Sequence, residues 1–281
     1  MSDEFKKSDV EILVATMNRS NLDFLIPMFP FADFADFNIL VINQTSHGQI
    51  ASSDFANVRI INSFERGLSK SRNLALENAL GKILLIADDD VVYKKDFDQN
   101  VIYAYNSNKN ASMICFETET FEDEPVRKYK SNYFWMKKAD FLWVLSIEIS
   151  FKRNDLLSNG VFFNEHFGLG AKFQDAESMY FLRSANFKGL KILFAPKFIV
   201  KHQKYSSSDD INSERWLYAK GAGFYKRYKG LSYFLIFKVV FFLLRKSYIS
   251  INQANEKIKI GLKGIKDYKK LIREGSENFY D

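Results

Sequence analysis

The chain lacks the residues that mark a secreted or an unfolded protein. Cys115 is its only cysteine, so no disulfide can form within the chain. Residues 1–11 carry charges where a signal peptide would have its apolar core. Only 4 of the 281 residues are proline, and 47% are apolar, which is typical of a folded protein. We therefore expect a folded protein with a cytoplasmic location.

Glycine-rich phosphate-binding loops are missing as well. No G-x-G-x-x-G follows the first apolar run, residues 11–15, which argues against a dinucleotide fold of the dehydrogenase type. Residues 16–20 read TMNRS instead, without the basic, glycine-rich loop that a nucleotidyltransferase usually carries after this strand. A nucleotidyltransferase stays an alternative because it would share the predicted sheet, metal and nucleotide pocket.

Short apolar runs alternate with amphipathic stretches along the first half of the chain. The runs predict strands at residues 11–15, 37–42, 58–61 and 83–86. A helix is expected from about Ser69, as its cap, to Leu80. This alternation is typical of a parallel sheet of right-handed βαβ units. We predict an α/β fold with a Rossmann-like, mostly parallel sheet flanked by helices.

The second half of the sequence is less regular. It predicts strands at residues 111–116, 146–151, 190–195 and 198–200, the last two separated by Pro196, and helices at 94–108 and from near Asp175 to Phe187. Residues 117–138 are expected to be irregular, and only helices are expected after Asn212. The predicted domains are residues 1–210 and a helical extension over residues 211–281.

Three consecutive acids, Asp88, Asp89 and Asp90, follow the apolar run of residues 83–86. They would lie at the carboxyl end of a buried strand, where open α/β sheets bind ligands. Three neighbouring carboxylates repel one another unless a cation is shared among them, so the sequence predicts a divalent-metal site. The alternative is that they only cap a turn or the next helix.

Five sequence blocks, taken in order, resemble the family 2 glycosyltransferases, which have the GT-A fold. The blocks begin at Thr16 and end at His202, and they read TMNRS, RGLSKSRNLAL, IADDDVVY, FGLGAKFQDAESMYFL and ILFAPKFIVKH. The resemblance is to the type found in bacterial polysaccharide biosynthesis. It implies an inverting, hexosyltransferase-type enzyme that moves a sugar from a nucleotide diphosphate sugar, such as a UDP-sugar, to a hydroxyl of a glycan or lipid-linked glycan.

The resemblance also implies roles for polar residues at the edge of the sheet. Mn²⁺ or Mg²⁺ would be held by a D-x-D motif, with Asp90 as a direct ligand and Asp88 nearer the ribose or a bound water. His202 would be a further metal ligand, or else a surface residue at a strand end. Residues implied to line the nucleotide pocket are Thr16, Arg19, Asn43, Arg72, Asn73, Asp88 and Asp89.

Two of these residue assignments, and the function class itself, have alternatives. Arg72 could be an ordinary solvated helix residue. The family's second strand normally ends in an aspartate that reads uracil, whereas this sequence has Asn43, so the nucleotide base stays open. A non-catalytic sugar-binding subunit is a further function class, but the presence of Asp88, Asp90 and Glu177 argues against it.

Two acids are candidates for the catalytic base. Glu177 matches the first acid of the family's usual acidic pair, and Ser178 replaces the second. Asp175 lies two positions earlier, and residues two apart on a helix do not share a face. A positioned carboxylate can take the proton of the attacking acceptor hydroxyl. We favour Glu177 for this role and keep Asp175 as the alternative.

Acidic residues are absent from one long segment. Residues 215–255 contain eight Lys or Arg and no Asp or Glu, in a chain whose net charge is +6. Within them, residues 231–244 form an apolar run that Lys238 interrupts and that is too short to span a bilayer. We expect peripheral contact with an anionic membrane at the cytoplasmic face of the inner membrane; the alternative is a buried helix. No nucleic-acid partner is expected.

Overall fold

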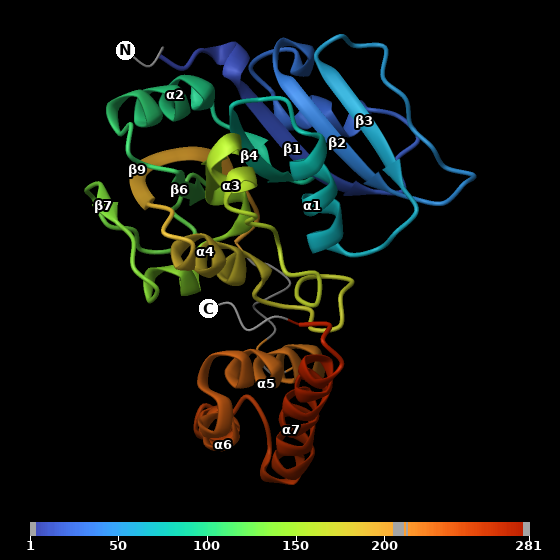
Figure 1. Cartoon of the computed structure of the whole chain (residues 1–281), viewed down its shortest axis with the longest axis vertical. Coiled ribbons are helices and arrows are strands. Elements are labelled where there is room, and N and C mark those ends of the chain that lie inside the picture. Colours follow the sequence, from blue (N-terminus) through green and yellow to red (C-terminus); the bar gives the residue numbers. More distant parts are fainter. Residues whose placement is uncertain (1–3, 205–210, 212, 278–281) are drawn as a thin grey trace. The chain divides into compact units, whose positions relative to one another are not determined.

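The computed structural model describes residues 4–204, 211 and 213–277 (Figure 1). The chain separates into two units by its internal contacts. The first comprises Met1–Phe163 and Ser178–Lys204, and the second comprises Asn164–Glu177 and Tyr205–Asp281. The second unit therefore includes a segment from the middle of the sequence. The division predicted at residue 210 stays a prediction.

A nine-stranded mixed sheet is the framework of the first unit. Its order is β3 (Val58–Ser63), β2 (Asn38–Gln44), β1 (Val10–Met17), β4 (Ile83–Asp88), β8 (Ile149–Lys152), β6 (Met113–Glu119), β9 (Ile192–Lys201) and β5 (Val92–Tyr93), with β7 (Phe134–Trp135) paired to β9. The first four strands in this order are parallel, as predicted. β8 enters antiparallel between β4 and β6, which makes the sheet mixed.

Helices accompany these strands in the chain (Figure 1). The α-helices that belong wholly or mainly to the first unit are α1 (Leu68–Asn78), α2 (Phe97–Ser107), α3 (Arg153–Ser158) and α4 (Glu177–Phe187). Short 3₁₀ helices lie at Lys7–Asp9, Asp23–Met28, Phe34–Asp36, Asp140–Trp143, Ser146–Glu148 and Lys229–Leu231. The fold class predicted from the sequence is thus confirmed.

The prediction is wrong at Ser69, at Pro196 and at residues 146–148, which form a 3₁₀ helix before β8. α1 is capped by Gly67, whose φ of 132° suits glycine, and the expected cap Ser69 is a buried residue inside the helix. Pro196 lies inside the single strand β9, where the pairing with β6 is irregular and a missing N–H is tolerated. The helix expected to start near Asp175 is confirmed as α4, which begins at Glu177, so that Asp175 itself precedes the helix.

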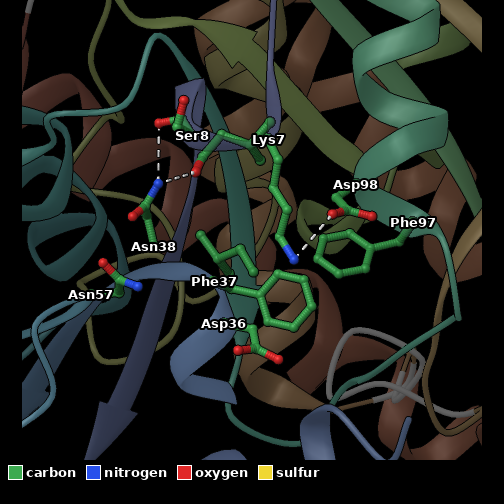
Figure 2. A pocket seen from close by; sticks show the side chains of 10 residues that line it. Lys7, Ser8, Asp36, Phe37, Asn38, Asn57, Phe97 and Asp98 are labelled. Atoms are coloured by element: carbon green, nitrogen blue, oxygen red, sulfur yellow. Dashed lines mark hydrogen bonds and ion pairs between the residues drawn. The ribbon is translucent and has the colours of Figure 1, made fainter. Parts of the chain in front are cut away.

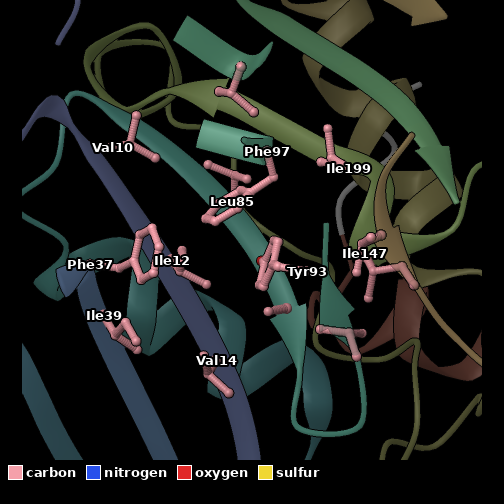
Figure 3. Close-up of a cluster of buried hydrophobic side chains, with 14 of the residues drawn as sticks. Val10, Ile12, Val14, Phe37, Ile39, Leu85, Tyr93, Phe97, Ile147 and Ile199 are labelled. Carbon is pink, nitrogen blue, oxygen red and sulfur yellow. The ribbon is translucent and has the colours of Figure 1, made fainter. Parts of the chain in front are cut away.

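The core of the first unit packs against the parallel strands. Figure 3 shows Leu85 of β4 beside Phe97 of α2, and Ile12 of β1 beside Phe37. Ile12, Leu85 and Phe97 are each at most 1% exposed. Aromatic rings continue this layer, since Phe29 stacks on Phe37 at 4.8 Å and on Tyr93 at 5.2 Å between ring centroids. Close packing of this kind fixes the positions of the strand ends.

A buried carboxylate ties the start of β4 to β1. Glu11 is 2% exposed, and its Oε2 accepts hydrogen bonds from the backbone N–H groups of Leu80 at 2.6 Å and Gly81 at 2.7 Å. Its Oε1 lies 2.6 Å from Arg59. A buried charge is tolerated when it is paired and hydrogen-bonded in this way. The acid triplet that ends β4 is therefore held in register with β1.

The described part of the second unit contains three α-helices, α5 (Glu214–Tyr228), α6 (Ser232–Arg245) and α7 (Ile251–Arg273). Their shared core includes Leu217, Ile236, Val240, Leu243 and Ile265. α5 and α7 approach closely at glycines: a Cβ added to Gly221 would lie 2.0 Å from the carbonyl oxygen of Gly261. The absence of a side chain is therefore a condition for this helix crossing.

We expect Gly221→Ala to destabilise the helical unit by roughly 1–3 kcal/mol or more, because the new methyl group would force the two backbones apart. Gly230→Ala is the matched control, since a Cβ there meets nothing within 4 Å. Urea denaturation followed by circular dichroism measures both. Equal stability of the two variants would contradict the close crossing.

Candidate functional site

Polar residues from three elements meet at the carboxyl ends of β1 and β4. Thr16 lies at the end of β1, and its hydroxyl donates to the Asp89 carboxylate at 2.5 Å. The guanidinium of Arg19 lies 2.6 Å from the same Asp89 oxygen. The Arg19 Nε also donates to the Thr16 hydroxyl at 3.1 Å. Three residues of the predicted nucleotide pocket thus form one hydrogen-bonded group.

Arg72 joins this edge from α1. Its guanidinium donates to Asp88 Oδ1 at 2.9 Å and lies 5.5 Å from the ring centroid of Phe163. Arg72 is only 3% exposed, so it is not the solvated helix residue of the alternative interpretation. A buried guanidinium beside a partly exposed carboxylate presents a strong, fixed donor at the strand end.

Two predicted pocket residues instead hold the backbone near the site. The Asn43 amide accepts from the Arg19 backbone N–H at 3.0 Å and donates to the Arg19 carbonyl at 2.8 Å. The Asn73 amide makes the same two kinds of bond with the backbone of Phe163, at 2.7 and 3.0 Å. Asn43 therefore fixes the backbone of Arg19. Asn73 fixes the backbone of Phe163, whose ring contacts Arg72. Their contact with a nucleotide stays a prediction.

Asp90 and His202 lie next to each other. His202 follows β9, and its Nε2 is 3.4 Å from Asp90 Oδ2. The side chain of His202 is 14% exposed and that of Asp90 is 56% exposed. The hydrogen bond between them raises the pKa of His202 and lowers the pKa of Asp90. An imidazole and a carboxylate therefore lie together at the strand ends, where both could bind a cation.

The three predicted metal ligands are only partly brought together. Asp90 and His202 are adjacent, whereas Asp88 is turned toward Arg72. Among the residues that the structure describes, no three His, Cys, Asp or Glu side chains gather into a metal-binding group. Oxygen from Asp90 and nitrogen from His202 still fit a cation that takes its other ligands from a diphosphate, as Mg²⁺ does in many sites.

The two candidate bases belong to the second unit and have different surroundings. Asp175 Oδ2 pairs with Lys220 of α5 at 2.8 Å, and its side chain is 9% exposed. Glu177 is half-buried and opens α4. Ala176 between them has a φ of 66°, an unusual conformation for a residue with a Cβ.

Sequence reasoning missed a group of buried acids in the first unit. Glu148 is fully buried and accepts hydrogen bonds from Arg127 and from the Tyr129 hydroxyl. Burial, with a smaller contribution from Glu148, raises the pKa of Glu117 to about 7. Burial also raises the pKa of the Cys115 thiol, which is 1% exposed. The irregular composition of residues 117–138 gave no periodic signal for this group.

A cavity of about 320 Å³ lies away from these residues, at the amino end of β1 (Figure 2). Lys7 pairs there with Asp98 at 3.8 Å and lies 4.3 Å from the centroid of the Phe37 ring. Because the acid triplet follows the opposite, carboxyl end of the parallel strands, this cavity is not part of the candidate site.

Comparisons with known proteins agree with this architecture. Residues 31–177 match the model of glycosyl transferase family 2. The fold resembles S. aureus TarS residues 1–349 with a TM-score of 0.53 and 13% identity, covering 95% of this chain and 91% of that one. The TarS complex with UDP-GlcNAc gives 0.55 and 13%, covering 95% and 92%. No curated protein matches the chain. The family match spans more than half of the sequence, and the protein therefore belongs to the family 2 glycosyltransferases, with a GT-A-type fold.

Proposed function

We propose that this glycosyltransferase is an inverting enzyme that moves a sugar from a UDP-sugar to a hydroxyl of a glycan or lipid-linked glycan. The observation that carries the proposal is the acid triplet at the end of β4, where Asp88 and Asp89 each hold a different arginine. Guanidinium groups fixed at the carboxyl edge of a parallel sheet suit a diphosphate ligand. The UDP and UDP-GlcNAc complexes of TarS support a uridine donor.

Arg19 and Arg72 would orient the diphosphate. Arg72 is buried and held by Asp88, whereas the side chain of Arg19 is 40% exposed and can turn toward a ligand. Asp90 and His202 would hold the metal ion, with the diphosphate oxygens as further ligands. Mn²⁺ or Mg²⁺ bound there would act as a Lewis acid and neutralise the charge that develops on the leaving diphosphate.

Glu177 is the proposed catalytic base. In an inverting transfer the acceptor hydroxyl attacks the anomeric carbon opposite the leaving diphosphate and gives up its proton to a carboxylate. The charge of Asp175 is already balanced by Lys220 within the second unit. The Asp175 oxygen that contacts the ammonium group is less accessible to an acceptor hydroxyl. Glu177 is favoured over Asp175 because it matches the position of the first acid of the family's usual acidic pair.

The acceptor is proposed to be a growing bacterial polysaccharide on a lipid carrier. The chain belongs to a family that transfers sugars, and its fold resembles that of TarS. A lipid-linked acceptor would bring the enzyme to the cytoplasmic face of the inner membrane. A panel of nucleotide sugars, with release of the nucleotide diphosphate as the readout, identifies the donor before acceptors are compared.

Asp90→Ala should abolish metal-dependent donor binding, because the diphosphate would then face Asp88 and Asp89 without a bridging cation. Calorimetry with UDP-GlcNAc, with Mn²⁺ and with EDTA, measures this. Asp54→Ala is the control, since Asp54 is an exposed acid of the same unit. A variant that bound the donor with unchanged affinity and unchanged Mn²⁺ dependence would remove Asp90 from the metal site.

Glu177→Gln should keep the donor affinity and lose on the order of 10² to 10⁴ in turnover, because the amide cannot accept the proton. Asp175→Asn should cost much less, since its main effect is to leave Lys220 without its partner. Transfer rates at saturating donor compare the two variants. If Asp175→Asn were the more damaging change, the base would have to be reassigned to Asp175.

A further inference from the structure

Helix α6 has one packed face and one exposed face. Ile236, Val240 and Leu243 are at most 2% exposed and pack in the core of the helical unit. On the opposite side Phe234 is 63% exposed and Phe241 is 65% exposed. The two alternatives for residues 231–244, a core helix and an interfacial helix, thus describe two faces of the same element.

Further apolar side chains widen the exposed face of α6. Phe237 is 50% exposed, Phe242 46%, and Leu231, just before the helix, 56%. Monomeric proteins rarely leave so many large apolar side chains together in water, and a contiguous patch marks an interaction surface. We use the name α6 aromatic face for Leu231, Phe234, Phe237, Phe241 and Phe242.

Basic side chains lie among these rings. Lys238 and Arg245 are exposed and each lies four positions after a phenylalanine of the face, Phe234 and Phe241. Residues four apart share one side of a helix. Long basic side chains can lay their aliphatic stems along apolar surface while the charge reaches water or a lipid headgroup. The α6 aromatic face is therefore cationic as well as apolar.

Helix α7 adds a continuous basic stripe. Lys259, Lys263, Lys266, Lys270 and Arg273 follow one another at spacings of four, three, four and three residues, and all are exposed. These spacings place them along a single face of the helix. Lys263 and Lys270 have acidic neighbours, Asp267 at 3.4 Å and Glu274 at 3.6 Å. The five residues lie on the side of α7 away from its buried Gly261, Ile265 and Tyr268, so they add to the charge of the unit and do not belong to the α6 aromatic face.

Positive charge is concentrated in this part of the chain. Residues 213–277 contain fifteen Lys and Arg against five Asp and Glu, a net charge of +10. Since the whole chain carries +6, the remaining residues sum to −4. An anionic partner would therefore be attracted to the helical unit and not to the protein in general.

The helices are suited to lie on a bilayer. No helix within the described residues is long and apolar enough to cross a membrane. α6 has 14 residues, about 21 Å at 1.5 Å per residue, against a hydrocarbon core of about 30 Å. A basic, amphipathic helix with aromatic side chains is the type of element that binds in the plane of the interface.

We propose that the helical unit docks on an anionic lipid bilayer, with the α6 aromatic face inserted at the interface and Lys238, Arg245 and Lys246 reaching the headgroups. Anionic lipid is the partner that matches both the exposed apolar side chains and the basic side chains, because a bilayer has an apolar interior beneath a negatively charged surface. The docking does not depend on the proposed sugar transfer. It would bring the enzyme to the surface in which a lipid-linked acceptor is held.

Sedimentation of the full-length protein with vesicles tests the proposal. The wild type should pellet with phosphatidylcholine and phosphatidylglycerol vesicles at low salt, pellet less at high salt, and bind phosphatidylcholine vesicles weakly. The double variant Phe234→Ser and Phe241→Ser should lose about tenfold or more in affinity at both salt concentrations. The triple variant Lys238→Gln, Arg245→Gln and Lys246→Gln should lose affinity mainly at low salt.

Matched controls come from the first unit. Leu80→Ser with Tyr103→Ser removes two exposed apolar side chains, and Lys109→Gln with Lys191→Gln and Lys197→Gln removes three exposed charges. These variants should bind vesicles as the wild type does. Circular dichroism and UDP-GlcNAc calorimetry should show that every variant keeps its fold and its donor binding.

Three outcomes would overturn the proposal. The wild type would remain in the supernatant with anionic vesicles at low salt, or the control variants would lose as much affinity as the docking variants. In the third, the protein would form a dimer that the Phe234 and Phe241 changes dissociate, without binding vesicles. The α6 aromatic face would then be an interface between two copies of the chain.

Discussion

The repulsion among three consecutive carboxylates is the constraint on which the site depends. Asp88, Asp89 and Asp90 are each paired with a different basic group: Arg72 of α1, Arg19 after β1 and His202 after β9. Because these partners come from distant parts of the sequence, the pairing requires β1, β4 and β9 to be placed correctly first. The buried Glu11 and the aromatic layer around Phe97 supply that placement within the first unit.

Much of the fold could be predicted from the sequence, because buried strands appear in it as continuous runs of apolar residues. Residues 83–86 and 37–42 predicted β4 and β2, and the five sequence blocks from Thr16 to His202 predicted the family. Side-chain partners were harder to predict, because they depend on which elements become neighbours in space. The sequence around Asp175 does not indicate that Lys220 is its ion-pair partner. The sequence around Arg72 does not indicate that its guanidinium contacts Asp88 and Phe163.

The errors have the same origin. Pro196 ends a strand in most sheets, but the irregular pairing of β6 with β9 accommodates it. The predicted cap Ser69 lies two residues after the observed cap Gly67, which adopts a conformation that glycine favours. For residues 231–244, helical periodicity identified an apolar helix but could not say which of its faces other helices would cover. The structure gives that answer through Ile236, Val240 and Leu243.

The lone cysteine has a practical consequence for studying this enzyme. Cys115 lies inside β6 at 1% exposure, and burial raises the pKa of its thiol, so little of the reactive thiolate forms while the chain is folded. Thiol reagents should therefore report on unfolding alone. A second cysteine introduced at an exposed surface position would become a unique attachment point for a fluorophore or spin label, without removal of the native residue.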